Sequence, residues 1–309
     1  MIKVKLTTIL VCICYCFFWV NMAIAQKNTN DYNYTISGKK LKLPEGWLLG
    51  EVAAVEVNSK GHIFVFNRGD HKLLKFDTNG NFLVEFGTGN TTFDIPHGLK
   101  IDQYDNVWTT DVGSHIVIKF SPAGEVLMVL GRQAHQGTYM EKWNYVIFDQ
   151  PTDVAIGPDG GIFVTDGYGN SRVVKFDKKG NHLKTWGEKG NEKGQFNLPH
   201  TVTVYDKKVY VGDRENKRIQ IFDLDGNFLN QWTNTGYPYS IKIFNEHLFS
   251  VDGVTCQVYI FDLNGKKVGE FGKRGFDKGE LSLPHWLDVN EEGIWIAEVL
   301  SWRAQHFDH

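Results

Sequence analysis

Three histidines of the chain stand at matching places, each directly after a proline. They are His97, His200 and His285, in the segments IPHGL, LPHTV and LPHWL. Three neutral imidazoles with an open fourth position are a common ligand set of catalytic zinc. One such histidine would be explained more simply as a polar loop residue. Three of the 11 histidines at one position predict instead a three-histidine metal site, with zinc the favoured ion.

Two arginines and a tyrosine occupy a second set of matching places. Arg68 and Arg214 each come one residue after an Asn or Asp, and Tyr168 comes two residues after an Asp. A guanidinium group is a fixed cationic fork that binds a carboxylate or an oxyanion. A phenol near a divalent cation and two arginines can act as a base, because positive charge stabilises the phenolate. The alternative for Arg214 is a structural ion pair with Asp213 or Glu215.

These residues lie on a repeat that occupies most of the chain. Its six units begin at Gly50, Ile95, Gln150, Leu198, Tyr237 and Leu283. Each unit contains short β-rich runs separated by tight turns; in the second unit the runs are residues 98–101, 107–110, 116–120 and 125–130. Four-stranded units repeated six times predict an all-β fold, a six-bladed β-propeller.

The three histidines belong to alternate units of this repeat, namely the second, fourth and sixth. The third and fifth units have Thr152 and Tyr239 at that position. In a six-bladed ring, equivalent positions in alternate blades are related by about 120° around the axis. Since the position lies where the chain enters the innermost strand, we expect the imidazoles to converge at one mouth of the central channel.

The last unit ends after its third strand, at His309. Residues 34–43, just before the first unit, can supply the missing outer strand and close the ring. Closure removes two exposed sheet edges, which an open ring would leave free to pair with other chains. We therefore expect one closed propeller domain over residues 34–309, preceded by a polar segment at 26–33.

Residues 1–25 are typical of a secretory signal peptide. A short basic start is followed by an apolar run at 6–20 and by a small-x-small ending at 23–25. Three of the four cysteines fall within this segment, so the mature chain keeps Cys256 alone and forms no internal disulfide. We expect a secreted or periplasmic protein without stable membrane insertion after cleavage. The alternative is a retained N-terminal membrane anchor.

Composition and charge limit the possible partners. The chain is 42% hydrophobic and has a formal net charge of −3, from 33 Lys and Arg against 36 Asp and Glu. This is a globular composition without the basic surface expected of a nucleic-acid-binding protein. We expect a monomer that acts on a small molecule or a peptide.

Several motifs resemble known families. The repeat core, seen as DGYGNSRVVKF and DRENKRIQIF, resembles the NHL repeat, and this match covers nearly all of the mature chain. A narrower set resembles peptidyl-α-hydroxyglycine α-amidating lyase, an NHL-type propeller. Its motifs are NRGDH at Arg68, PHGL at His97, DGYGNSR at Tyr168, FNLPH at His200, DREN at Arg214 and LPH at His285.

The lyase resemblance implies a zinc enzyme that cleaves a carboxy-terminal α-hydroxyglycine, or a related carbinolamide, to an amide and glyoxylate. It implies zinc ligation by His97, His200 and His285, a base at Tyr168, and contacts from Arg68 and Arg214 to the substrate and the transition state. The chemistry agrees, since the substrate hydroxyl must lose a proton, the departing nitrogen must gain one, and the carboxylate needs a cationic partner.

Two departures from that family concern the tyrosine loop and a second metal. Animal members have a disulfide-bonded cysteine directly after the tyrosine, where this chain has Gly169. They also have an aspartate after the third histidine that helps to bind a structural calcium in the channel. This chain has Trp286 there and Asp288 two residues later, while Leu99 keeps the position of a backbone calcium ligand. Calcium is therefore an open expectation beside zinc.

Two other functional classes remain open. One is a calcium-dependent propeller hydrolase that acts on lactones or esters, against which the three histidines argue. The other is a non-catalytic, extracytoplasmic scaffold of NHL repeats, since a propeller fold assigns no function by itself. The metal that the protein binds separates these classes from a zinc lyase.

Overall fold

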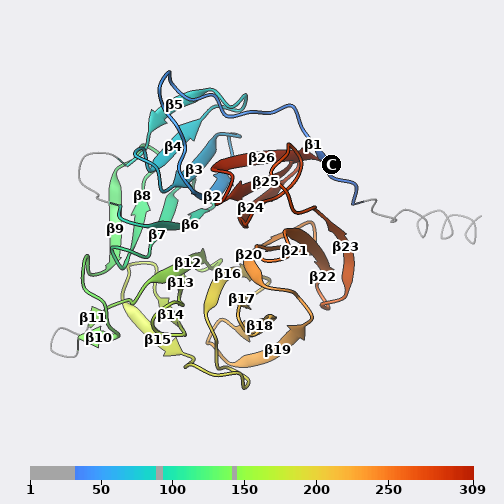
Figure 1. Cartoon of the computed structure of the whole chain (residues 1–309). Helices are drawn as coiled ribbons and strands as arrows, with labels where there is room; N and C mark the ends of the chain where they lie inside the picture. Colours follow the sequence, from blue (N-terminus) through green and yellow to red (C-terminus); the bar gives the residue numbers. More distant parts are fainter. Residues whose placement is uncertain (1–31, 88–92, 141–144) are drawn as a thin grey trace, which may run out of the picture. The chain divides into compact units, whose positions relative to one another are not determined.

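Six antiparallel sheets of four strands follow one another around a central axis (Figure 1). The computed structural model describes residues 32–87, 93–140 and 145–309. The chain divides into two compact units, residues 1–33 and 34–309, and the strands described here lie in the second. The strand that starts each repeat unit is innermost, so each sheet is one blade. This arrangement confirms the predicted all-β, six-bladed propeller.

The blades follow the order of the sequence. Blade 1 contains β2 (Val52–Val57), β3 (Ile63–Asn67), β4 (Leu73–Phe76) and β5 (Phe82–Glu85); blade 2 contains β6 (Pro96–Ile101), β7 (Val107–Asp111), β8 (Ile116–Phe120) and β9 (Val126–Gly131). Blade 3 contains β12 (Pro151–Ile156), β13 (Ile162–Asp166), β14 (Arg172–Phe176) and β15 (His182–Trp186); blade 4 contains β16 (Pro199–Tyr205), β17 (Lys208–Asp213), β18 (Arg218–Asp223) and β19 (Phe228–Thr233). Blade 5 contains β20 (Pro238–Phe244), β21 (His247–Asp252), β22 (Gln257–Asp262) and β23 (Lys267–Phe271); blade 6 contains β24 (Pro284–Asn290), β25 (Gly293–Glu298), β26 (Arg303–Asp308) and β1 (Thr35–Ile36). A short hairpin of β10 (Tyr139–Met140) and β11 (Tyr145–Val146) lies between blades 2 and 3 in the sequence.

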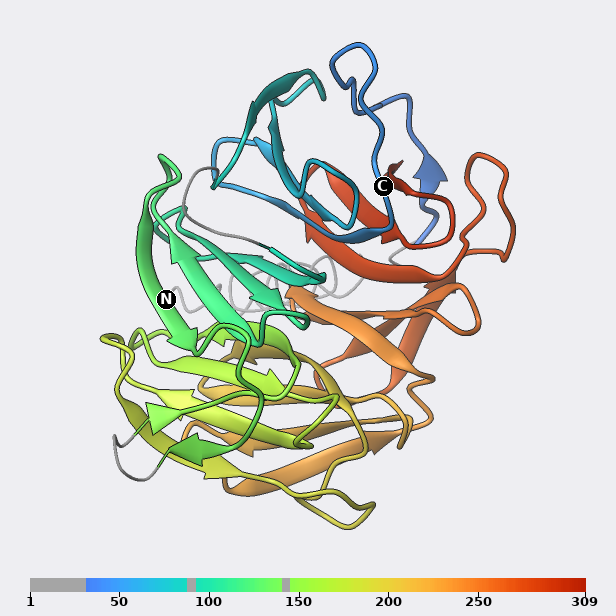
Figure 2. The same ribbon diagram turned by 60° about the vertical axis from the view of Figure 1, so that its left-hand side comes forward.

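Strand β1 closes the ring as the outer strand of blade 6. It pairs with β26 through Thr35↔Asp308 and Ile36↔Phe307, and the Ser37 amide donates to the His306 carbonyl at 2.9 Å. The chain's C-terminus accordingly lies beside β1 in both ribbon views (Figure 2). The expected closure is confirmed, although two residues form the paired strand rather than all of 34–43.

Apolar side chains pack between neighbouring blades and fix their spacing. The Phe86 ring of blade 1, for example, lies 6.0 Å from the Phe120 ring of blade 2. Second strands such as β13 are buried along their whole length, whereas the outer strand β15 alternates between partly buried and exposed residues before the buried Trp186. Turn residue Gly226 has φ +74, and a Cβ there would lie 2.7 Å from the Trp186 ring of the preceding blade. Glycine at this turn therefore serves both the backbone conformation and the packing between blades.

Blades 3 and 4 each contain a buried ion pair that joins the second strand of the blade to the third. Arg172 Nε donates to Asp166 at 2.9 Å, and Arg218 Nε donates to Asp213 at 2.7 Å. Both arginines also donate to loop carbonyls, so they hold the loops at the proline end of the blades. These arginines of the repeat motif are therefore structural.

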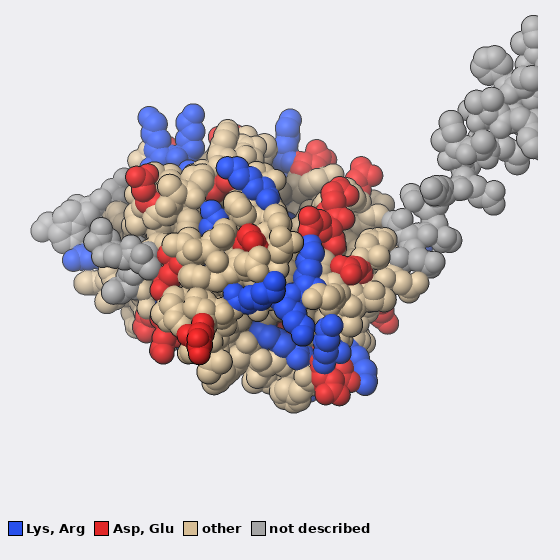
Figure 3. Space-filling view, turned by 90° about the horizontal axis from the view of Figure 1, so that it is seen from above, with Lys and Arg blue, Asp and Glu red and all other residues tan. Residues whose placement is uncertain are grey.

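The surface and the N-terminal segment add little to the functional argument. One side of the propeller, seen edge-on, carries both basic and acidic side chains (Figure 3). Within the residues that the structure describes, no helix is long and apolar enough to cross a membrane. The predicted signal peptide, residues 1–25, lies outside the described residues.

Candidate metal centre

A β-bulge at the start of each inner strand positions the candidate ligands. In blade 4, Pro199 pairs with Asp213 and Thr201 pairs with Gly212, so His200 is the extra residue between them. The same shift occurs at His97 and His285. A bulge turns its residue out of the regular alternation of side chains. The three histidines can therefore face one another at the proline end of the channel.

The three imidazole rings converge from blades 2, 4 and 6. Their ring centroids lie 4.6 Å apart for His97–His200, 4.7 Å for His97–His285 and 5.0 Å for His200–His285. One ring nitrogen from each lies within 4.8 Å of the others, and all three residues are buried. The structure thus brings together the predicted ligands, in an arrangement that fits one metal ion.

Backbone carbonyls fix the orientation of all three rings. The Nδ1–H groups of His97, His200 and His285 donate to the carbonyls of Thr152 at 2.7 Å, Tyr239 at 2.6 Å and Ala53 at 2.7 Å. Since a carbonyl can only accept, each proton is on Nδ1 and the lone pair is on Nε2. Such hydrogen bonds to the second ring nitrogen are what metal-binding histidines require.

The environment keeps these imidazoles neutral. Burial is the main cause and lowers the pKa of His285 to about 3. Burial also holds the pKa of His97 and of His200 well below the usual range, and the positive charges of Arg68 and Arg214 add to the effect. A neutral imidazole is the form that ligates a metal, so the centre is prepared for one at neutral pH.

Tyr168 lies over the centre, as the sequence predicts for a base. Its hydroxyl oxygen is 3.1 Å from Nε2 of His97 and 3.2 Å from Nε2 of His200. The side chain is 38% exposed, so a substrate can reach it from solvent. Its loop is held by the Gly169 amide, which donates to the Asp149 carbonyl at 3.0 Å. A backbone hydrogen bond thus holds the loop where the animal enzymes are expected to have a disulfide.

Both predicted arginines lie beside the centre, and both have an acidic partner. Arg214 Nη1 is 3.5 Å from the Tyr168 hydroxyl, while its Nε donates to Glu215 at 2.8 Å. Arg68 donates through Nη1 to Glu51 at 2.7 Å and through Nε to the Pro96 carbonyl at 3.0 Å. The ion-pair alternative for Arg214 is therefore present, with Glu215, and does not remove the guanidinium from Tyr168.

Tyr239 is a member of the site that the sequence interpretation missed. Its ring lies 5.1 Å from the His200 ring and 5.8 Å from the His285 ring, and the Arg214 guanidinium carbon is 4.7 Å from its centroid. In the sequence, Tyr239 stands at the position of blade 5 that a histidine occupies in blades 2, 4 and 6. That position could have indicated a side chain at the channel mouth, but it was interpreted only as the absence of a histidine. Tyr239 forms a wall of the site and fixes both Arg214 and His200.

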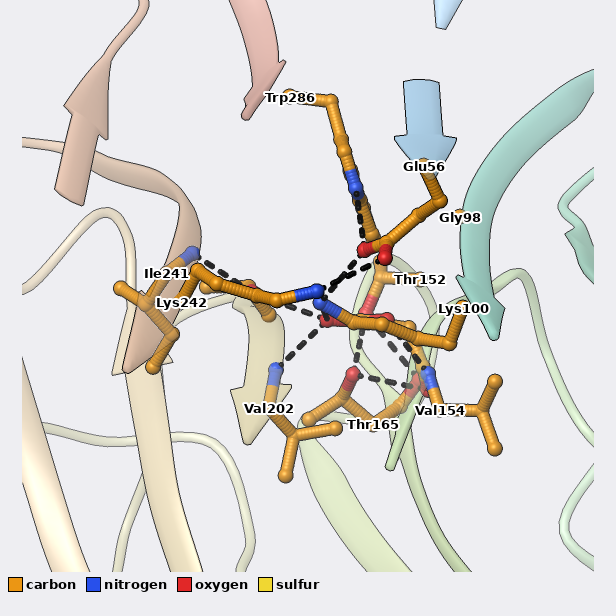
Figure 4. Close-up of polar contacts among 12 residues, drawn as sticks. Glu56, Gly98, Lys100, Thr152, Val154, Thr165, Val202, Ile241, Lys242 and Trp286 are labelled. Carbon is orange, nitrogen blue, oxygen red and sulfur yellow. Dashed lines mark hydrogen bonds and ion pairs between the residues drawn. The ribbon is translucent and has the colours of Figure 1, made fainter. Parts of the chain in front are cut away.

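Deeper in the channel, Lys100 and Lys242 lie among the carboxylates of Glu56, Asp153 and Asp288. Figure 4 shows both lysines beside Glu56. Lys242 Nζ lies 2.8 Å from Glu56 and 2.6 Å from Asp288. Burial alone would lower the pKa of Lys242, but these two carboxylates raise it overall. Lys100 Nζ lies 3.7 Å from Glu56 and 3.8 Å from Asp153, and 4.5 Å from the Trp286 ring centroid. Burial raises the pKa of Asp153 and of Asp288 to about 6.

These channel side chains do not fit a calcium site. Asp288, the acidic residue nearest to the position expected for a calcium ligand, already accepts from the Lys242 ammonium group and from the Val57 amide. Calcium prefers several oxygen ligands, whereas here ammonium groups supply the counter-charge. Leu99 is buried in β6, and its role as a backbone calcium ligand stays a prediction.

Comparison with known proteins agrees with the predicted repeat. The NHL repeat family matches residues 148–176 and 196–222. The chain contains NHL repeats. It is 36% identical over 219 residues to the peptidyl-glycine alpha-amidating monooxygenase of Mus musculus, a match that covers 60% of this chain and 22% of that protein. It is 34% identical over 218 residues to a probable peptidyl-alpha-hydroxyglycine alpha-amidating lyase of Caenorhabditis elegans, covering 62% and 60%.

A further relative has no activity in its name. The chain is 38% identical over 207 residues to NHL repeat-containing protein 3 of Homo sapiens, covering 62% of this chain and 58% of that protein. The matches thus span between about a fifth and three fifths of the relatives' own lengths.

Solved structures show the fold. A streptogramin B lyase superposes with a TM-score of 0.61 at 14% identity, covering 89% of this chain and 98% of that one. A gluconolactonase from Xanthomonas campestris gives 0.63 at 12% identity, covering 89% and 97%. At these identities the likeness concerns the propeller alone.

Proposed function

We propose that this chain is a zinc-dependent lyase that converts a peptide ending in α-hydroxyglycine to a peptide amide and glyoxylate. The observation that carries the proposal is the convergence of three neutral imidazoles on one point, with the Tyr168 hydroxyl within 3.2 Å of two of them. The name of the 34% identical relative, a probable peptidyl-alpha-hydroxyglycine alpha-amidating lyase, supports the same reaction class.

The reaction requires two proton movements and one bond cleavage. The substrate hydroxyl loses its proton, the bond between the hydroxyl-bearing carbon and the amide nitrogen breaks, and the nitrogen takes the electron pair and a proton. His97, His200 and His285 would hold the zinc ion, which would supply Lewis-acid chemistry that makes the substrate hydroxyl more acidic. Tyr168, as phenolate, accepts the hydroxyl proton and can return it to the departing nitrogen.

Arg214 and Arg68 would provide positive charge at two places in the reaction. Arg214, 3.5 Å from the Tyr168 hydroxyl, stabilises the phenolate. Arg68, held by Glu51 and the Pro96 carbonyl, is placed to attract the substrate carboxylate towards the histidines. Each arginine also keeps its acidic partner, which limits its movement and so fixes the direction of the remaining N–H groups.

Two variants test the assignment through different readouts. His200→Ala should lose bound zinc and glyoxylate release together, because it removes one of three ligands. Tyr168→Phe should keep the zinc and lose at least about a hundredfold in kcat, the usual contribution of a positioned acid–base group. The exposed His135→Ala is the matched control. Full activity in either site variant would contradict the proposal.

Metal analysis of the purified protein separates this function from its alternatives. One zinc per chain, with glyoxylate release from an N-acyl-α-hydroxyglycine, supports the lyase. Calcium alone, with ester or lactone hydrolysis, would support the hydrolase. No bound metal would support a non-catalytic scaffold.

We further propose that the protein acts after export, in the periplasm or outside the cell. The basic start, apolar run and small-x-small ending of residues 1–25 support this. Amino-terminal sequencing of the protein recovered from the extracytoplasmic fraction tests it, with Gln26 as the expected first residue. An intact Met1 in that fraction would contradict cleavage.

A further inference from the structure

The mouth that holds the three histidines has a polar side and an apolar side. Tyr168 comes two residues after Asp166, the residue of β13 that pairs with the first residue of β12. Asp252 in β21 and Glu298 in β25 likewise pair with the first residue of their inner strands. Two places after them stand Val254 and Leu300. The position of the candidate base is therefore occupied by aliphatic residues in blades 5 and 6.

A cavity of about 360 Å³ lies among these aliphatic residues. Its lining is mostly apolar, with the polar side chains of Arg274 and Ser282 beside Val254, Cys256, Phe276, Leu283 and Leu300. Phe276 is 69% exposed, Leu300 58% and Val254 39%. The volume is within the range of pockets that bind small molecules, and three neighbouring apolar side chains open to solvent are costly unless a ligand covers them.

One aromatic ring separates this cavity from the candidate metal centre. Gly253 lines the cavity, and a Cβ at this residue would lie 2.9 Å from the Tyr239 ring and 3.0 Å from the Pro284 carbonyl. On its other side, the Tyr239 ring is 5.1 Å from the His200 ring. Leu283, another lining residue, is two residues before His285. The cavity and the centre are thus adjacent subsites of one mouth.

The fold does not require apolar residues here, as a comparison between blades shows. The loop GKRGFDKGELSLPH that enters blade 6 repeats the loop GEKGNEKGQFNLPH that enters blade 4. Both loops contain the same isolated bridge, Arg274↔Leu281 in one and Lys189↔Phe196 in the other. The residue that matches Phe276 is Asn191.

The following loop differs in the same sense. Leu300 comes two residues after Glu298, and the matching residue two places after Asp213 is Glu215. Blade 4 thus builds the same loops with polar residues at both places. The loop conformation therefore does not require apolar residues at Phe276 and Leu300.

We propose that this cavity binds an apolar side chain of the residue that precedes α-hydroxyglycine in the substrate. The inference rests on the proposed lyase function. Consecutive Cα atoms are about 3.8 Å apart. A substrate whose α-hydroxyglycine lies at the histidines can therefore place the side chain of the preceding residue beyond the Tyr239 ring, in the cavity. The occupant is apolar because Phe276, Leu300 and Val254 gain most when they cover a hydrocarbon surface.

The test compares substrates that differ only in that residue. For N-acetyl-Phe-α-hydroxyglycine against N-acetyl-Gly-α-hydroxyglycine, the zinc-loaded protein should give a kcat/KM ratio of about ten or more. Phe276→Asn, which copies the blade 4 residue, and Leu300→Glu should each lower this ratio about tenfold. Because both side chains are mostly exposed, neither change opens the core. Leu229→Asn, at a half-exposed leucine of outer strand β19, is the control and should leave the ratio unchanged.

The outcomes separate this inference from the proposed function. If both substrates are turned over and neither variant changes the kcat/KM ratio, the cavity assignment is wrong and the lyase proposal is unaffected. If neither substrate releases glyoxylate, the lyase proposal fails, and calorimetric binding of N-acetyl-Phe-amide against N-acetyl-Gly-amide decides the cavity. Tighter binding of the phenylalanine amide that weakens in Phe276→Asn supports it, and equal binding overturns it.

Discussion

Removal of the Lys242 ammonium group should destabilise the whole propeller, and Lys242→Met tests this. The ammonium group lies 2.8 Å from Glu56 and 2.6 Å from Asp288, and the side chains of both acids are almost fully buried. Removing one member of a buried ion pair costs about 3–5 kcal/mol, because the remaining charge is left without a partner. Lys100, 3.7 Å from Glu56, remains as partial compensation. The loss should therefore be near the lower end of that range.

This loss converts to a measurable change in melting temperature. For a domain of this size, 1 kcal/mol corresponds to about 2 °C, so a loss near 3 kcal/mol should lower the Tm by about 6 °C at pH 8. Differential scanning calorimetry of the zinc-loaded protein measures it. Lys266→Met, at an exposed turn lysine, is the matched control and should melt within about 1 °C of the wild type.

The destabilisation by Lys242→Met should also depend on pH. Burial already raises the pKa of Asp288 to about 6, and loss of the lysine raises it further. A group whose pKa is raised in the folded state stabilises the fold below its unfolded pKa and loses that contribution as pH rises through the folded value. The variant should therefore lose less at pH 5.5 than at pH 8. A variant that melts within 2 °C of the wild type at pH 8, or whose deficit is the same at both pH values, would refute this account.

Three further predictions concern stability. Burial raises the pKa of Asp153 to about 6, so the stabilisation of the fold by this group is present below pH 3.8 and is lost as pH rises through about 6. Asp153→Asn should remove this fall in Tm between pH 3.8 and about 6, and an unchanged pH profile of Tm would contradict the prediction. Arg218→Met leaves buried Asp213 without its cation and should cost about 3–5 kcal/mol in urea unfolding; a loss under 1 kcal/mol would contradict the structural role. Deletion of residues 1–37 removes β1 and frees the edge of β26, so light scattering should show a lower onset of aggregation, and an unchanged onset would show that the edge is protected otherwise.

The fold and the convergence of histidines could be predicted because both depend on the repeat. Five of the six units place a proline at the start of the inner strand, and the next residue lies in the bulge whether it is His200, Thr152 or Tyr239. Equivalent sequence positions therefore become equivalent positions around the axis. For this reason the alternation of histidines along the chain was sufficient to place them together.

The channel lysines could not be predicted in the same way. Lys100 and Lys242 alternate with apolar residues in GLKI and SIKI, a pattern that normally indicates a strand with one face in solvent. In this fold the second face of an inner strand is the channel, and neither pairing partner of Lys242 is near it in the sequence. Their carboxylate partners, Glu56 and Asp288, come from blades 1 and 6, so only the closed ring defines the cluster.

The hydrogen bonds behind the histidines make the ring a single cooperative unit. Each Nδ1–H donates to a carbonyl of the next blade, from blade 2 to 3, from 4 to 5 and from 6 to 1. The last of these bonds, from His285 to Ala53, joins blades 6 and 1, which are far apart in the sequence; their contact is the seam of the ring. Open repeat arrays can fray from either end, whereas this ring opens only if the seam breaks both at its axis and at its rim. A metal ion held by the three imidazoles would bind only the closed ring, so the metal concentration would set the population of opened ring that a protease can reach.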